Sequence, residues 1–153
     1  MHLETAIVIQ RPPEEVWAYL GDISNVSKWD RGVSATRQTS HGPSGVGLEF
    51  DTLAHPKGKV DGGEWGKMSY RIVETDPIRG CTIQLTSSSG NARFFKTAEW
   101  RFRVEPAAEG AWVVCAAYFK LRFPYIFLAP IFYGMKKAIH SDLESLKQAV
   151  ERG

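Results

Sequence analysis

Cysteine is scarce in this chain of 153 residues, which contains only Cys81 and Cys115. The two form neither a CxxC motif nor the spacing of a disulfide framework. The features of an export signal are also missing, because Met1–Gln10 has neither a basic segment nor a long apolar one. We therefore expect a cytoplasmic protein whose thiols are reduced.

Charge of one sign and long hydrophobic runs are lacking as well. The 19 Lys and Arg against 17 Asp and Glu leave a net charge of +2, and the basic residues form no long run. This balance does not predict a phosphate-binding surface, so we expect no nucleic acid partner. The most apolar stretch, Phe123–Met135, is interrupted by Pro124 and Pro130 and is shorter than the roughly 20 residues that cross a bilayer.

The patterns of metal and nucleophile sites are missing too. His140-Ser141-Asp142 has the residue types of a catalytic triad, but consecutive helical residues point about 100° apart, which predicts a solvated helix flank. Gly42–Gly47 is glycine-rich, yet a strand follows it where a phosphate loop needs a helix. We expect no metal and no other cofactor, because none of the histidines has a partner at ligand spacing: His2, His41, His55 and His140.

An ordinary globular composition, with 43% hydrophobic and 24% charged residues, predicts a single domain over residues 1–153. Thr5–Gln10 is expected to form the first strand, and two short helices follow at Pro13–Leu20 and Ser24–Trp29. A polar, glycine-rich loop is expected over His55–Glu64. Alternating apolar residues predict six more strands: Val33–Ser40, Val46–Leu53, Trp65–Thr75, Cys81–Ser87, Arg93–Glu105 and Ala111–Leu121. The last of these is apolar on both faces, and we expect it to be well covered.

The end of the chain has helical periodicity. One apolar stripe predicts a helix of about 23 to 28 residues: Leu128, Phe132, Met135, Ile139, Leu143, Leu146 and Val150. Seven antiparallel strands leave one face to cover, and only this helix is long enough to cover it. The predicted fold is α+β, with a curved sheet wrapped around a long C-terminal helix. Curvature separates sheet and helix on one side, which predicts an apolar pocket between them.

Four motifs in this order resemble a known family. The first motif, at Ile9–Trp17, consists of an apolar residue, proline, acidic residues and Val-Trp. In the second motif, within Leu20–Trp29, an aspartate precedes a tryptophan. The third and fourth motifs, Gly45–Gly47 and Arg71–Pro77, are similar to motifs that come later in the sequences of the same family. Together with the long last helix, they resemble the START-like helix-grip superfamily (SRPBCC), in its polyketide cyclase/dehydrase and lipid-transport branch. The resemblance implies a cavity for a hydrophobic ligand between sheet and C-terminal helix, but no single activity.

The apolar face supplies the candidate ligand-binding residues. Among them, Tyr70 and Tyr118 carry phenols that need hydrogen-bond partners when buried, which a ligand carbonyl could supply. Lys96 is in phase with the residues that are expected to point inward. Two interpretations stay open: its ammonium group contacts a ligand, or the side chain snorkels from the strand end into water. The candidates are Trp29, Phe50, Met68, Tyr70, Ile83, Leu85, Trp100, Phe102, Tyr118, Phe127, Phe132 and Met135. Filling of the core by these side chains is the competing interpretation.

Three functions remain open at this point. A carrier or sensor of a small hydrophobic or lipid-like molecule needs only shape and apolar surface. A polyketide cyclase or aromatase needs a proton donor or acceptor in the pocket. Arg71, Tyr70 and Lys96 are the candidates, and alternation puts Arg71 and Tyr70 on opposite faces. Glu49 and Asp51 share the polar face and are expected to meet water. A protein-interaction domain is the third possibility, and we lean against an enzyme.

Two further expectations concern the entrance and the partners. Pro130 should start or kink the last helix and Gly134 should weaken it, so the segment before them is expected to loosen and admit ligand. Lys120, Arg122 and the Lys136-Lys137 pair near this apolar segment leave weak contact with a membrane surface open. The chain is expected to be a monomer or a homodimer.

Overall fold

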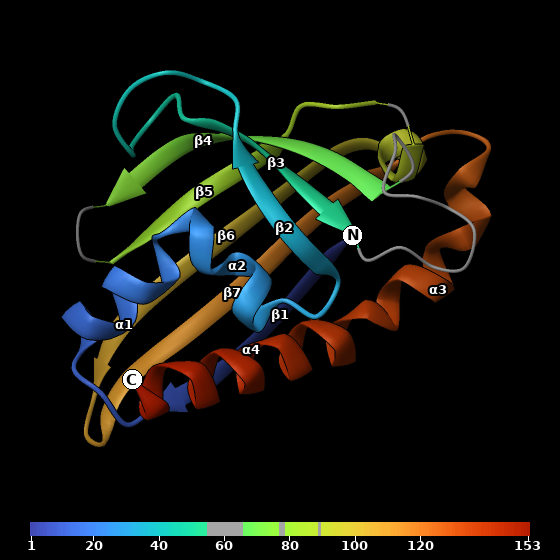
Figure 1. Ribbon diagram of the computed structural model, residues 1–153. Helices are drawn as coiled ribbons and strands as arrows, with labels where there is room; N and C mark the ends of the chain where they lie inside the picture. Colours follow the sequence, from blue (N-terminus) through green and yellow to red (C-terminus); the bar gives the residue numbers. More distant parts are fainter. Residues whose placement is uncertain (55–65, 77–78, 89) are drawn as a thin grey trace.

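A curved antiparallel sheet is the main element of the fold. The structure, a computed structural model, describes residues 1–54, 66–76, 79–88 and 90–153 (Figure 1). Within these residues seven strands form one sheet in the order β1-β7-β6-β5-β4-β3-β2. Their bounds are β1 His2–Ile9, β2 Val33–Gln38, β3 Glu49–Ala54, β4 Lys67–Asp76, β5 Gly80–Leu85, β6 Phe95–Ala107 and β7 Gly110–Leu121. The strands from β2 to β7 are neighbours in chain order, whereas β1 pairs with β7.

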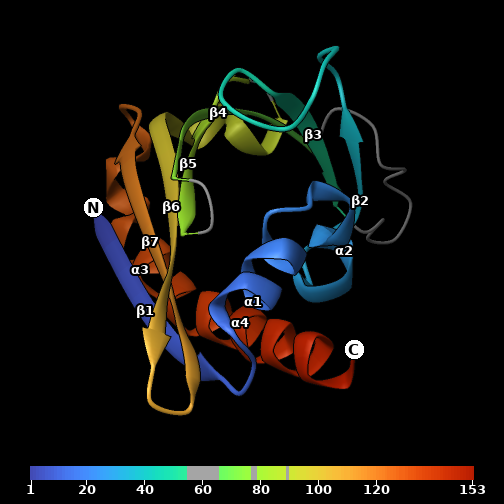
Figure 2. The same cartoon turned by 90° about the vertical axis from the view of Figure 1, so that its left-hand side faces the viewer.

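The first two strands lie at opposite edges of the sheet, so the chain between them crosses its concave side. This crossing contains α1 (Pro13–Leu20), the 3₁₀ helix η1 (Ile23–Asn25) and α2 (Val26–Trp29). Figure 2 shows the sheet bending around these helices. Asp22 caps η1 by accepting a hydrogen bond from the Ser24 amide at 2.9 Å. The predicted helix Ser24–Trp29 is therefore two short helical pieces.

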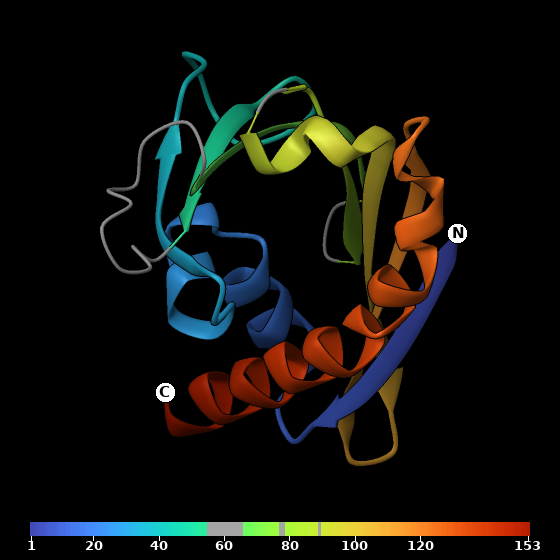
Figure 3. The same ribbon diagram turned by 90° about the vertical axis from the view of Figure 1, so that its right-hand side faces the viewer.

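The helix α4 (Met135–Arg152) lies along the open side of the sheet (Figure 3). Its buried face consists of Ile139, Leu143, Leu146 and Val150, and it packs against β1 and α2. The seven-stranded curved sheet with a long C-terminal helix confirms the predicted fold class. The first two residues of the predicted apolar stripe, Leu128 and Phe132, lie in earlier helical pieces, η4 (Tyr125–Leu128) and α3 (Ala129–Tyr133).

The prediction of one continuous terminal helix is wrong, because α3 ends at Gly134. The Gly134 amide donates to the Ile131 carbonyl at 3.1 Å, which closes a tight turn before α4 begins. Helical spacing continues through the turn, so periodicity alone gave no sign of it. The break leaves α4 with 18 residues.

Two strand predictions also need correction. The strand expected from Val46 begins at Glu49, because Gly45 and Gly47 have φ angles of +146° and +94° and keep the intervening residues in a turn. The last strand is not covered on both faces, since Trp112 is 44% exposed on its outer side. The loop predicted over His55–Glu64 lies outside the described residues.

Candidate functional site

An apolar cavity of about 130 Å³ lies between the concave face of the sheet, α2 and α4. An engineered cavity of roughly this size in another protein holds benzene, so the space fits one small ring. The strands contribute alternate residues, because only every second side chain of a strand points inward. The lining comprises Leu20, Gly21, Ile23, Val26, Trp29, Asp30, Val33, Phe50, Thr52, Tyr70, Ile72, Cys81, Ile83, Trp100, Phe102, Cys115, Ile139, Asp142 and Leu143.

Aromatic rings form the walls of this cavity. Trp29 meets Phe102 edge to face, with ring centroids 6.1 Å apart and planes at 78°. Phe50 stacks on Tyr70 at 5.6 Å. Such contacts between rings hold the walls in fixed positions. The walls are therefore suited to a flat, apolar molecule.

The indole nitrogen of Trp29 is an unusual feature of the lining. Trp29 is only 7% exposed, and its Nε1 has no hydrogen-bond partner among the described residues. An unpaired buried donor costs about 1 to 3 kcal/mol, so nearly all are paired in folded proteins. The local reason for its burial is that Trp29 ends α2, directly before the chain turns into β2. A ligand with an acceptor atom would satisfy this group.

The phenol of Tyr70 is the second polar group of the cavity. Its hydroxyl donates to the Met68 Sδ at 3.6 Å. Burial raises the pKa of Tyr70 far above its ordinary value, and the negative charge of Asp30 raises it further. The phenol therefore stays neutral and can donate a hydrogen bond to a ligand oxygen.

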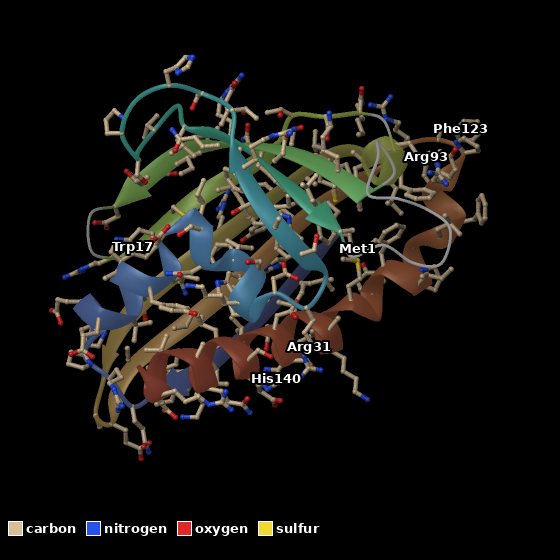
Figure 4. The ribbon with its side chains drawn as sticks, in the orientation of Figure 1. Met1, Trp17, Arg31, Arg93, Phe123 and His140 are labelled. Carbon is tan, nitrogen blue, oxygen red and sulfur yellow. The ribbon has the colours of Figure 1, made fainter. Side chains whose placement is uncertain are left out.

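Two carboxylates, Asp30 and Asp142, also belong to the lining. Burial raises the pKa of Asp30, although a hydrogen bond from the Gly32 amide opposes the rise. Burial also raises the pKa of Asp142 to about 6, and the charge of Asp30 adds to this rise. Asp142 accepts a hydrogen bond from the Arg31 amide at 3.2 Å, and Figure 4 shows Arg31 beside α4. A carboxyl group with such a pKa can accept or release a proton near neutral pH.

Sequence reasoning missed both carboxylates. The prediction of a solvated helix flank at Asp142 is wrong, because α2 packs on α4 and half-buries the Asp142 side chain. A signal was present: Asp142 follows Ile139 by three residues and precedes Leu146 by four, which puts it at the edge of the apolar stripe. Asp30 had no comparable signal.

The structure brings six of the predicted ligand-binding residues into the cavity lining: Trp29, Phe50, Tyr70, Ile83, Trp100 and Phe102. Met68 and Leu85 are half-buried against the two hydrophobic clusters of the core, a larger one that contains Leu143 and Leu146 and a smaller one formed by Leu48, Phe50, Tyr70 and Ile72. Phe132 and Met135 pack on the larger cluster and do not reach the lining.

Two predicted residues lie away from the cavity. Tyr118 faces the outer side of the sheet, where its ring stacks on His2 at 4.4 Å and the Arg101 guanidinium lies 4.6 Å from it. The inward positions of β7 are its neighbours Ala117 and Phe119, so alternation turns Tyr118 outward. Phe127 is 72% exposed in η4.

The polar candidates on the sheet are also outside the cavity. Lys96 is exposed, because the pairing of β6 with β7 shifts between Phe95 and Thr97 and turns this position outward. Arg71 donates to Glu49 on the outer face, with its Nε 2.9 Å from the Glu49 carboxylate. Arg71 and Tyr70 thus lie on opposite faces, as alternation predicted.

The prediction that Asp51 meets water is wrong, because this residue is only 5% exposed. Arg37 donates to its carboxylate at 2.9 Å and the Ser69 hydroxyl at 2.7 Å. Burial alone would raise the pKa of Asp51, but these hydrogen bonds and the charges of Arg37 and Lys67 outweigh it and lower the pKa. Asp51 is thus a paired structural group on the outer face.

Two larger hollows, of about 410 and 460 Å³, lie over the outer face of the sheet. Charged side chains line both, among them Arg101 and Arg103 in one and Lys96 and Glu99 in the other. Pockets that bind small molecules are lined mainly by apolar groups with a few polar ones. The inner cavity meets this description better, despite its smaller size.

Neither a metal centre nor a membrane span is found in the part of the chain that the structure describes. Its His, Cys, Asp and Glu side chains form no group of three or more that could hold a metal ion. None of its helices is long and apolar enough to cross a membrane.

Comparison with solved structures finds many proteins of the same fold. The Zhui aromatase/cyclase from Streptomyces sp. R1128 matches with a TM-score of 0.80 and 13% identity, over 99% of this chain and 94% of that one. Protein MLL2253 from Mesorhizobium loti matches with a TM-score of 0.73 and 17% identity, over 99% and 98%. Ara h 8.0201 matches with a TM-score of 0.77 and 12% identity, over 100% and 99%. At these identities the likeness shows the helix-grip fold alone.

A search of the curated proteins gives no match. A family model does match, over residues 1–151, and its description is polyketide cyclase/dehydrase and lipid transport. The match spans nearly the whole chain and agrees with the resemblance seen in the sequence motifs. The chain therefore belongs to the polyketide cyclase/dehydrase and lipid transport family.

Proposed function

We propose that this protein binds a small, ring-bearing hydrophobic molecule in the cavity between sheet and α4, as a carrier or sensor. The observation that carries the proposal is the apolar cavity with aromatic walls, one of whose lining residues, Trp29, has a buried Nε1 without a partner among the described residues. A ligand carbonyl or ether oxygen would accept its hydrogen bond and remove the cost of the buried donor. The ring of such a ligand would lie among Trp29, Phe50 and Phe102.

The volume of the cavity restricts the class of ligand. About 130 Å³ fits one small ring, whereas the pockets that bind drug-sized ligands measure roughly 300 to 1,000 Å³. The neutral phenol of Tyr70 offers a second donor in the same lining. A small aromatic ketone fits these features better than a fatty acid or a sterol.

Nuclear magnetic resonance of the indole N–H groups tests this proposal. Acetophenone, which carries a carbonyl acceptor, is titrated into ¹⁵N-labelled protein, with benzene as the probe that lacks an acceptor. We expect acetophenone to shift the Trp29 indole signal downfield, while benzene shifts it little. The Trp29→Phe variant identifies the signal, and the exposed Trp112 on the outer face is the internal control. An unmoved Trp29 signal at saturating acetophenone would overturn the proposal.

A second candidate, an enzyme of the cyclase type, is favoured by Asp30 and Asp142. With a pKa of about 6, Asp142 is ionised above that pH and can accept a proton from a carbon next to a ligand carbonyl. In that step the C–H bond breaks, the proton passes to the carboxylate, and the enolate oxygen takes the negative charge. The neutral phenol of Tyr70 is a second donor of the lining, beside the Trp29 indole, suited to stabilise that oxygen.

Deuterium exchange separates the two candidates. The methyl protons of acetophenone in D₂O are exchanged through the enolate, so an enzyme of this type accelerates their loss. Asp142→Asn should abolish the acceleration, and Glu144→Gln, at an exposed position on the same helix, should retain it. Binding of acetophenone without faster exchange identifies a carrier or sensor.

A further inference from the structure

An exposed apolar surface lies at the end of the molecule formed by η4 and α3. Five large side chains make up this surface, which we call the apolar patch: Phe123 at 88% exposure, Ile126 at 58%, Phe127 at 72%, Ile131 at 69% and Tyr133 at 54%. They come from a stretch of eleven successive positions, 123–133. Single exposed apolar residues are ordinary, but five of them within eleven positions point to an interaction site.

The opposite side of the same segment holds these side chains outward. The Tyr125 ring lies edge to face with Phe94 at 5.0 Å, and the Phe132 ring lies 5.2 Å from Phe95. The Arg122 amide donates to the Phe94 carbonyl at 2.8 Å and its Nε to the Phe95 carbonyl at 3.0 Å. Because Tyr125 and Phe132 already fill the contact with the core, the patch has no room to fold inward.

The charges around the patch are all of one sign along the chain. The sequence has no acidic residue between Glu109 and Asp142. The same stretch contains the exposed basic residues Lys120, Arg122, Lys136 and Lys137. Arg93, in η3 (Gly90–Phe94), lies over the Phe94 ring at 4.3 Å, and Figure 4 shows it at the same end of the molecule as Phe123.

We propose that this apolar patch, together with the basic residues Lys120, Arg122, Lys136 and Lys137, docks on the surface of an anionic lipid bilayer. Apolar side chains flanked by lysine and arginine are the composition of interfacial membrane segments, which lie in the headgroup region without spanning the bilayer. The described helices contain no span, which fits a surface contact. A second copy of the chain would oppose Lys136 and Lys137 with like charges, whereas anionic lipid complements them.

Sedimentation with vesicles tests the proposal. Binding is measured on vesicles of phosphatidylcholine with phosphatidylserine and on vesicles of phosphatidylcholine alone. We expect binding to the anionic vesicles that weakens as salt is raised, because salt screens the basic residues. Phe123→Ser with Phe127→Ser should lower the affinity at least about tenfold. Lys136→Gln with Lys137→Gln should lower it about 25-fold, at about fivefold per charge.

Matched controls carry the same chemical change elsewhere. Val46→Ser with Trp112→Ser removes two exposed apolar side chains outside the patch, and Lys28→Gln with Arg152→Gln removes two distant charges. Both should bind vesicles nearly as the wild type does. No binding to anionic vesicles, or equal loss in patch and control variants, would overturn the proposal. So would self-association in sedimentation velocity that the patch variant abolishes, if vesicles are not bound.

A direct readout guards against a variant that fails to fold. Burial raises the pKa of Cys81 to about 11 and that of Cys115 further, so both natural thiols react slowly with labels. Ile131→Cys therefore takes a polarity-sensitive dye selectively. We expect its emission to shift to the blue when anionic vesicles are added, and the emission of dye on Val46→Cys to remain unchanged. A dye at residue 131 that stays in water would overturn the proposal.

Discussion

Asp30 and Asp142 accept hydrogen bonds from successive backbone amides of one turn. The Gly32 amide donates to Asp30 at 2.9 Å and the Arg31 amide to Asp142 at 3.2 Å. The turn after α2 therefore holds two carboxyl groups from distant parts of the chain at the same cavity. Because each ionised group disfavours ionisation of the other, the pair links the charge of the site to pH.

Asp142 is expected to make the stability of the protein depend on pH. Its pKa of about 6 in the folded state exceeds its value in the unfolded chain, so the folded state binds more protons between about pH 4 and pH 6. The free energy of unfolding should therefore fall as the pH rises through this range. Asp142→Asn removes the effect and should gain about 1 to 2 kcal/mol on the wild type between about pH 4 and pH 7, a value reduced for partial exposure.

Urea denaturation of both proteins across this pH range measures the difference. Glu144→Gln is the control, because it removes a carboxylate from an exposed position of the same helix. A constant difference between Asp142→Asn and the wild type at all pH values would contradict the prediction.

Asp51 should have the opposite pH dependence. Its lowered pKa means that its contribution is complete above about pH 4 and is lost as the pH falls through the folded pKa. Asp51→Asn removes the charge that Arg37 and Ser69 bind, at a cost of about 1.5 to 3 kcal/mol near pH 7. The loss should shrink in acid, as measured by urea denaturation. Equal losses at acid and neutral pH would show that the ion pair contributes nothing through its charge.

Periodicity predicted the fold well because each strand of the sheet has one covered face. In β4, Tyr70 faces the cavity and Arg71 meets Glu49 outside, as strict alternation requires. The same rule failed for Tyr118, because β7 is apolar on both faces and its pattern does not tell which face is inward. The break at Gly134 was not visible in the periodicity, since both helical pieces keep the same spacing; only the glycine itself, which was expected to weaken the helix, pointed to it.

The candidate site was predictable in its apolar part only. Trp29, Phe50 and Phe102 reach the lining because their elements place large apolar side chains toward the concave face. Asp30 and Asp142 become half-buried only through the packing of α2 on α4, a contact between segments far apart in the chain. The spacing of Asp142 from Ile139 and Leu146 puts it at the edge of the apolar stripe, but no local pattern tells which element packs against that edge. The unpaired state of Trp29 Nε1 is likewise a property of the assembled cavity.

Alanine substitution at Gly110 tests the steric fit at the hairpin between β6 and β7. Gly45, in the turn before β3, is the matched control. Their φ angles are +145° and +146°, a region that residues with a side chain rarely adopt, so alanine is strained at both positions. At Gly110 a Cβ would also clash with the Ile9 carbonyl oxygen, whereas at Gly45 no atom of the other described residues lies within 4 Å of it. Gly45→Ala should cost about 1 to 3 kcal/mol and Gly110→Ala clearly more. Equal losses in thermal unfolding would mean that β1 moves aside without cost.

The segment before the break at Gly134 should open more readily than α4. The helix α3 has five residues and its outer side chains are exposed, whereas α4 buries Leu143 and Leu146 against the core. Amide exchange follows local opening, and short, exposed elements open at low free energy. Hydrogen exchange measured by mass spectrometry without lipid should therefore be faster in 125–133 than in 139–146. Equal protection of the two segments would contradict both this prediction and the idea that the segment loosens to admit a ligand.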